Sequence, residues 1–216
     1  MKRIILLAIP ALALGLLPRQ VAEAQGTLYV SNLGLTSSGT SSIGNDSWLA
    51  VDFQTGTNAG GYSLNSLQLA LADASGNPSG FAAMLYTQHG AANPEPGSSL
   101  GTLNGSLNPV TGGIYTYSPA SSLALSPSTV YFIVLIAGTA VANGAYEWSV
   151  TSTSAFTSSG GWHGGDGLFP SSDGLNWGYT HVYAQFAIYA TAVPEPSTLG
   201  LLALGGFLLV WRRRRA

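Results

Sequence analysis

The feature that most constrains this chain is the complete absence of Lys and Arg between Gln20 and Trp211. All seven cationic residues lie in the two terminal segments. The intervening stretch still carries carboxylates, which, apart from Glu23 and Glu195 near its two ends, are Asp46, Asp52, Asp73, Glu95, Glu147, Asp166 and Asp173. None of these can pair with Lys or Arg, and cysteine is absent. A fold made from this stretch of roughly 170 residues must therefore be stabilised by apolar burial and backbone hydrogen bonds, for which one domain of that size suffices.

The same composition excludes several classes of partner and chemistry. Without a basic patch the domain cannot neutralise phosphates, so we expect no nucleic-acid binding. Anionic lipid headgroups are poor partners for the same reason. The lack of cysteine excludes thiol catalysis and cysteine-based metal sites.

The middle of the chain predicts β-strands. Residues 48–54 alternate, with Leu49, Val51 and Phe53 on one face. Leucines at every second position mark residues 67–71, and the same period recurs in residues 81–85. The Gly- and Pro-containing cluster at 73–80 lies between these two strands, and we interpret the unit as a β-hairpin.

Further strands are expected at 113–117, 129–137, 146–151 and 181–190. Residues 129–137 are apolar on both faces, which predicts a central strand. No amphipathic helical pattern is present in this region. We therefore predict an all-β fold over residues 25–192, an antiparallel two-sheet sandwich that is jelly-roll-like.

The N-terminus has the pattern of a signal peptide. Lys2 and Arg3 precede an apolar stretch at 4–17, and Ala22 and Ala24 form a small-x-small cleavage pattern. We predict a signal helix over residues 1–24 that signal peptidase removes after Ala24.

The C-terminus carries a second targeting pattern. Pro194, Glu195 and Pro196 precede an uncharged apolar run at 199–211, and the chain then carries Arg212, Arg213, Arg214 and Arg215. As a helix the run would reach about 20 Å, which is short against a hydrocarbon core of about 30 Å. The arginines would stay in the cytoplasm and leave the main domain outside.

Residues 193–216 resemble the PEP-CTERM sorting signal, because a Pro-Glu-Pro motif, a short transmembrane helix and an arginine tail occur in that order. The resemblance implies that an exosortase-type protease processes the chain. It also implies export, transient anchoring in the inner membrane, and a final place at the outer surface or in the extracellular matrix. Proteins of this family occur in bacteria that make exopolysaccharide, which makes such a polymer a candidate partner.

The middle of the chain is similar to the choice-of-anchor surface domains. The stretches that carry this resemblance are 48–57, 62–71, 77–86, 112–117 and 125–134. The resemblance implies a β-sandwich and supplies no catalytic residues.

No catalytic constellation stands out. There is no Gly-x-Ser-x-Gly elbow, and most of the carboxylates lie in turns. Asp52 and Glu147 lie in predicted strands and are the better candidates for a glycosidase pair. The spacing of Asp166 and Asp173 fits neither an EF-hand loop nor the Gly-Gly-x-Gly-x-Asp repeat, although an acidic domain without Lys or Arg is compatible with a structural calcium ion. We expect no enzyme activity, no metal site and no cofactor.

Residues 158–178 form the most distinctive predicted loop. Its aromatic residues could stack on a sugar while its polar residues bind hydroxyl groups; the candidates are Trp162, His163, Asp166, Phe169 and Trp177. Alternatively, the tryptophans fold inward and cap the sandwich, which we favour. Our first functional prediction is thus a non-enzymatic surface or matrix protein associated with exopolysaccharide. A carbohydrate-binding module is the second, and a glycan-active hydrolase is the third.

Overall fold

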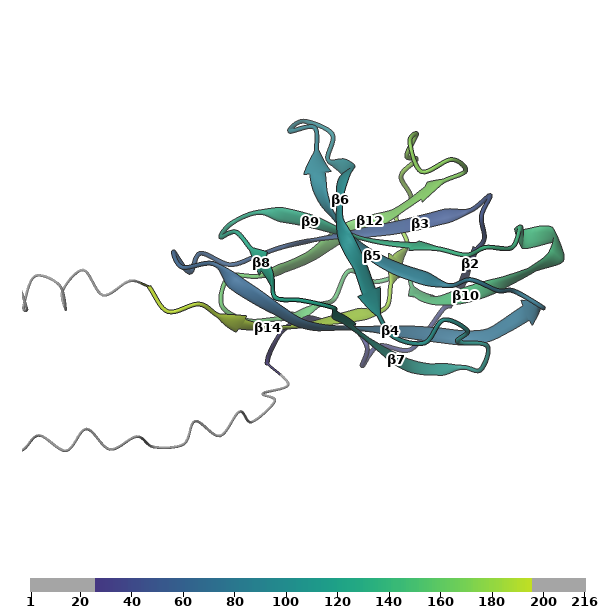
Figure 1. Cartoon of the computed structure of the whole chain (residues 1–216), viewed down its shortest axis with the longest axis horizontal. Helices are drawn as coiled ribbons and strands as arrows, with labels where there is room; N and C mark the ends of the chain where they lie inside the picture. The colour runs from purple at the N-terminus through teal and green to yellow at the C-terminus, as the bar shows by residue number, and fades with distance from the viewer. Residues whose placement is uncertain (1–25, 196–216) are drawn as a thin grey trace, which may run out of the picture.

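The computed structural model describes residues 26–195, which form an all-β, wholly antiparallel fold of fourteen strands in two layers (Figure 1). Sheet A contains β1 (Thr27–Ser31), β2 (Gly39–Ile43), β4 (Tyr62–Gly76), β7 (Gly113–Pro119), β8 (Leu123–Leu125), β10 (Gly144–Thr151), β11 (Thr157–Ser158), β13 (Tyr183–Ala184) and β14 (Phe186–Ala192). Sheet B contains β3 (Trp48–Gln54), β5 (Ala82–His89), β6 (Glu95–Asn104), β9 (Val130–Ile136) and β12 (His163–Ser171).

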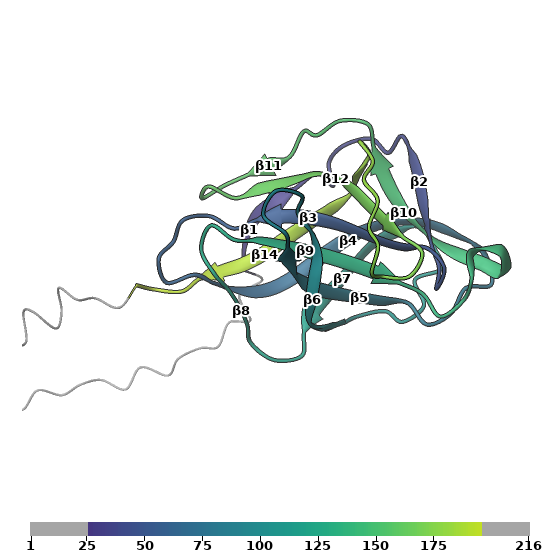
Figure 2. The ribbon, with the colours of Figure 1, turned by 90° about the horizontal axis from the view of Figure 1, so that it is seen from above.

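The two sheets pack face to face and are joined along one side by pairing of β6 with β7 (Figure 2). The strands therefore form one nearly closed arrangement. The prediction of an all-β antiparallel fold is confirmed, whereas the jelly-roll connectivity stays a prediction. The predicted signal and transmembrane helices fall outside the described residues. Within 26–195 there is no α-helix, only the 3-10 turn η1 (Val141–Asn143), and no helix there is long and apolar enough to cross a membrane.

The core lies between the sheets and follows the period-two pattern of the sequence. Leu49, Val51 and Phe53 of β3 point inward and meet Leu67 and Leu69 of β4, all of them buried. β9 lies between β3 and β5 in sheet B, which confirms the prediction of a central strand at 129–137. The two faces of β9 pack into different apolar clusters. Ile133 belongs to the main core, and Phe132 belongs to a second cluster on the outside of sheet B.

The predicted hairpin between residues 67 and 85 is wrong. β4 belongs to sheet A and β5 to sheet B, and β5 pairs with β6 and β9 instead of β4. The connection therefore arches from one sheet to the other, with positive φ at Gly76 and Gly80. Both strands still bury the predicted faces, because an arch and a hairpin demand the same alternation from each strand.

The predicted loop at 158–178 is also largely wrong, because residues 163–171 form strand β12, paired with β3. This strand escaped prediction because its first half, His-Gly-Gly-Asp-Gly, has the composition of a turn. The sequence analysis also does not predict strands β1, β2, β6, β8 and β11. β2, with the sequence Gly-Thr-Ser-Ser-Ile, carries only one large apolar side chain.

A buried polar network fixes the junction of β13 and β14. The Asn32 side chain donates to the Ala184 carbonyl at 3.0 Å and accepts from the Phe186 N–H at 2.8 Å. Gln185, between them, accepts a hydrogen bond from the Trp148 indole at 3.0 Å. These contacts let one chain segment pair with β10 and then with β4.

Both ends of the described chain leave from the same end of the sandwich (Figure 1). β1 and β14 are antiparallel neighbours, and Thr27 pairs with Ala190. The N-terminal predicted cleavage site and the Pro-Glu-Pro motif are thus attached to adjacent strands.

Candidate functional site

The outer face of sheet B carries an unusual concentration of apolar rings. Ala50, Phe132, Val134 and Phe169 form a buried cluster there. The ring of Phe132 lies 5.2 Å from that of Phe169 in an edge-to-face arrangement. We call this surface the aromatic face; the partly buried side chains packed on it are Trp48, Met84, Tyr86, Val130 and Trp177.

A β-bulge places two carboxylates beside this face. Gly164 pairs with Phe53 and Leu168 pairs with Val51, so residues 165–167 all lie opposite Asp52. The bulge brings the backbone N–H of Asp166 to 3.2 Å from Asp52 Oδ1. A Cβ at Gly165 would collide with the backbone and carboxylate of Asp52, so only glycine fits. Bulges often re-aim side chains next to functional sites.

Asp52 is unusual because it has an ionisable carboxyl group and yet its exposed fraction is only 9%. Burial raises the pKa of its carboxyl to about 6, and the nearby charge of Asp166 also contributes to the rise. Asp52 is therefore partly protonated in mildly acidic solution.

A series of exposed hydrogen bonds continues from the bulge through Tyr179 to His181. Tyr179 is 46% exposed and donates its hydroxyl to the Asp166 carbonyl at 2.7 Å. The same hydroxyl lies 3.2 Å from Nδ1 of His181. The Tyr179 ring is 5.3 Å from that of Phe169, so it extends the aromatic face outward. Burial and the charge of Asp166 raise the pKa of Tyr179.

The structure separates the five residues of the predicted ligand loop. Trp162 is 1% exposed and stacks between Tyr29 and Phe53 in the main core, with no partner for its indole N–H. Phe169 and Trp177 belong to the aromatic face on the outside. His163 and Asp166 are exposed on β12. A stacking platform that includes Trp162 is therefore not available, and for this residue the inward alternative holds.

Sequence reasoning missed Tyr86, Phe132 and Tyr179. The signal was present in β9, because a strand that is apolar on both faces of a two-layer fold must have apolar cover on its outer side. Asp52 and Glu147, the candidate glycosidase pair, do not share a cleft. Asp52 is on the outside of sheet B, whereas Glu147 lies in sheet A, where it accepts from Ser42 at 2.9 Å.

The described residues offer no donor cluster for a metal. No group of three or more His, Cys, Asp or Glu side chains that could hold an ion occurs within 26–195. Asp173 is instead the centre of its own turn and accepts from the N–H groups of Leu175 and Asn176 at 2.8 and 2.9 Å. These hydrogen bonds lower the pKa of Asp173 well below its usual value.

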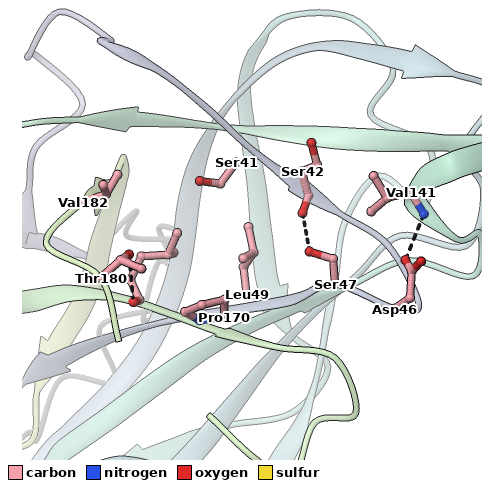
Figure 3. Close-up of a pocket in the computed structure, with 10 residues that line it drawn as sticks. Ser41, Ser42, Asp46, Ser47, Leu49, Val141, Pro170, Thr180 and Val182 are labelled. Carbon is pink, nitrogen blue, oxygen red and sulfur yellow. Dashed lines mark hydrogen bonds between the residues drawn. The ribbon is translucent and has the colours of Figure 1, made fainter. Parts of the chain in front are cut away.

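A cavity of about 540 Å³ lies between the edge strand β2 and the end of β12 (Figure 3). Its polar groups are mostly bonded within the protein. Ser47 donates to the Ser42 carbonyl at 2.8 Å, and the Val141 N–H donates to Asp46 at 2.9 Å. It therefore presents few free polar groups, and we assign no ligand to it.

The sorting motif begins where the folded domain ends. Val193 follows β14 directly, and Pro194 and Glu195 come next; all three are exposed. Pro196 and the arginine tail lie outside the described residues, as do Ala22 and Ala24.

Comparison with known protein families finds that residues 192–215 match the PEP-CTERM protein-sorting motif. Neither the curated proteins nor the solved structures include a match to this chain. The motif makes this an exported protein sorted by an exosortase, with transient C-terminal membrane anchoring before processing.

Proposed function

We propose that this protein is a non-enzymatic component of the cell surface or extracellular matrix whose β domain binds exopolysaccharide through the aromatic face. The observation that carries the proposal is the aromatic face itself, which lies beside the carboxyl groups of Asp52 and Asp166 on the outside of sheet B. The similarity to choice-of-anchor surface domains agrees with such a role and stays a prediction.

The two outer faces of the sandwich differ, which supports this choice of surface. On sheet A the outward positions of β4 and β7 are small or polar, such as Ser66, Gln68 and Thr116, except for Ile114 of β7, which is 58% exposed. Gln68 and Thr116 are hydrogen-bonded to each other. On sheet B the corresponding positions of β3 and β5 hold the partly buried rings of Trp48 and Tyr86, which pack against a cluster containing the fully buried Phe132 of β9. Aromatic rings with hydrogen-bonding groups at their edge suit sugars, which present both C–H faces and hydroxyl groups.

The charge of the domain indicates which polysaccharides it would accept. There is no Lys or Arg between Gln20 and Trp211, and the aromatic face carries carboxylates. Uronate or sulfated polymers would be repelled. Neutral polysaccharides and polymers of amino sugars carry no such penalty, and these are the proposed ligand class.

Affinity electrophoresis of the mature protein from the host medium tests the proposal. The gels would contain the host exopolysaccharide, a neutral β-glucan, chitosan or alginate. We expect the host polymer or one of the neutral or amino polymers to retard the protein, and alginate to leave its mobility unchanged.

Matched variants locate the binding surface. Tyr86→Ala and Trp177→Ala each remove a ring from the aromatic face and should weaken binding by about tenfold, equivalent to about 1.4 kcal/mol. Tyr189→Ala, on β14 in the other sheet, removes a tyrosine that is also partly buried and should change nothing. Equal losses in all three variants, or no retardation by any polymer, would contradict the proposal.

A second candidate function is glycan hydrolysis with Asp52 as a general acid. Its raised pKa and the neighbouring Asp166 favour this hypothesis. Its low exposure and its hydrogen bond to the bulge are equally consistent with a structural role. Release of reducing ends from the retarding polymer, lost in Asp52→Asn, would establish hydrolysis and overturn the non-enzymatic assignment.

A further inference from the structure

Val193, the residue before Pro194-Glu195-Pro196, is held by both of its backbone groups. The N–H of Val193 donates to the Gly61 carbonyl at 3.0 Å. The Val193 carbonyl accepts from the side-chain amide of Asn58 at 2.9 Å. We call this pair of hydrogen bonds, formed between Val193 and the loop at 58–61, the exit clasp.

The loop that forms the exit clasp is itself a tight turn. The Gly61 N–H donates to the Asn58 carbonyl at 2.8 Å, and Gly61 has a φ of 71°. The Asn58 amide also donates to the Gly61 carbonyl at 2.6 Å, so its two hydrogens serve two carbonyls. A Cβ at Gly60 would collide with the carbonyl of Val193, which shows how closely the loop at 58–61 approaches the backbone just after β14.

Pro194 ends this pairing because proline has no N–H to donate. Residues 194–198 separate the clasp from the apolar run that begins at Leu199. Covalent geometry limits five residues to about 17 Å. While the tail is inserted, the protease must therefore act on a short segment between the folded domain and the bilayer.

We propose that the exit clasp positions the Pro-Glu-Pro motif for sorting, and that Asn58 is its positioning residue. A fixed Val193 and the restricted φ of Pro194 reduce the conformational freedom that the protease would otherwise have to remove on binding. The clasp forms only in the folded β domain, so processing depends on folding. This inference rests on the exosortase processing that the motif implies, and is independent of the glycan-binding proposal.

Asn58→Asp in the full chain, expressed in the native host, tests the clasp. The substitution keeps the size of the side chain, removes both amide donors and sets a carboxylate against two carbonyls. We expect tail removal, followed by pulse-chase and intact mass, to slow roughly two- to tenfold, the range for loss of one hydrogen bond. The released protein should also show more than one C-terminal end. Asn143→Asp makes the same change on the exposed η1 turn at the opposite end of the sandwich and should be processed as the wild type.

A second variant covers the case in which Asn58→Asp disturbs folding. Insertion of Gly-Ser-Gly between Val193 and Pro194 leaves every described backbone hydrogen bond intact and only detaches the motif from the clasp. It should slow processing to a similar extent, with unchanged thermal unfolding. Wild-type rates and a single wild-type C-terminus in both variants would overturn the clasp alone, as would faster processing. A wild-type chain that keeps Arg212–Arg215 at the surface would overturn exosortase processing, and the clasp with it.

Discussion

Asp52 links local structure to the acid–base behaviour of the domain. Its carboxyl is desolvated between β9 and the bulge of β12, which raises its pKa from 3.8 to about 6. The folded state therefore holds a proton that the unfolded chain releases between about pH 4 and pH 6. Over that window the contribution of Asp52 to the free energy of unfolding falls as the pH rises, and it is constant at higher pH.

Asp52→Asn should remove this pH dependence. At pH 7.5 the variant should have a free energy of unfolding about 2–3 kcal/mol above the wild type, the equivalent of a shift of two pKa units. At pH 3.5 the two proteins should be alike. Urea unfolding at both pH values measures this difference, and a variant less stable than wild type at pH 7.5 would contradict the prediction.

Single residues also show where sequence reasoning reaches its limit. The alternation in residues 48–54 correctly placed Leu49, Val51 and Phe53 in the core and Asp52 on the opposite face. It could not show that Asp166 would lie beside Asp52, because this depends on a bulge in a strand that looks like a turn. For Trp162 the favoured sequence alternative, an inward-folded tryptophan, holds, because stacking on Tyr29 and Phe53 buries it. The sequence could not show which rings it would stack on, because Tyr29 and Phe53 are far from it along the chain.

At the scale of the element, the sequence predicts strands better than it predicts their neighbours. β3 has the predicted bounds, and β9 has the predicted central position. The link from β4 to β5 was assigned to a hairpin, because a strand's alternation records which face is buried and not which strand lies beside it. Long-range features such as the polar junction at Gln185 decide that choice, and they leave little local signal.

Asn32 tests the importance of that junction. Its side chain takes the place of a neighbouring strand's backbone, because it donates to the Ala184 carbonyl and accepts from the Phe186 N–H. Asn32→Ala leaves both groups buried without that partner and should lower the free energy of unfolding by about 2–4 kcal/mol. Asn104→Ala, on an exposed position of β6, should change it by less than about 0.5 kcal/mol. Chemical denaturation of the two variants measures the difference, and similar values would show that the junction contributes little.

At the scale of the whole molecule, the lack of cations predicts an unusual response to salt. Surface ion pairs weaken as salt screens them, but no Lys or Arg lies between Gln20 and Trp211 to form one. The remaining electrostatic effect among the carboxylates is repulsion, which screening relieves. Raising sodium chloride from about 0.05 M to about 0.5 M shortens the Debye length from above about 10 Å to well below it. This change should leave the Tm of the mature protein unchanged or slightly higher. Scanning calorimetry at pH 7.5 provides the measurement. A Tm that falls with added salt would mean that attractive charge pairs stabilise the domain, which its sequence does not allow without a bound cation.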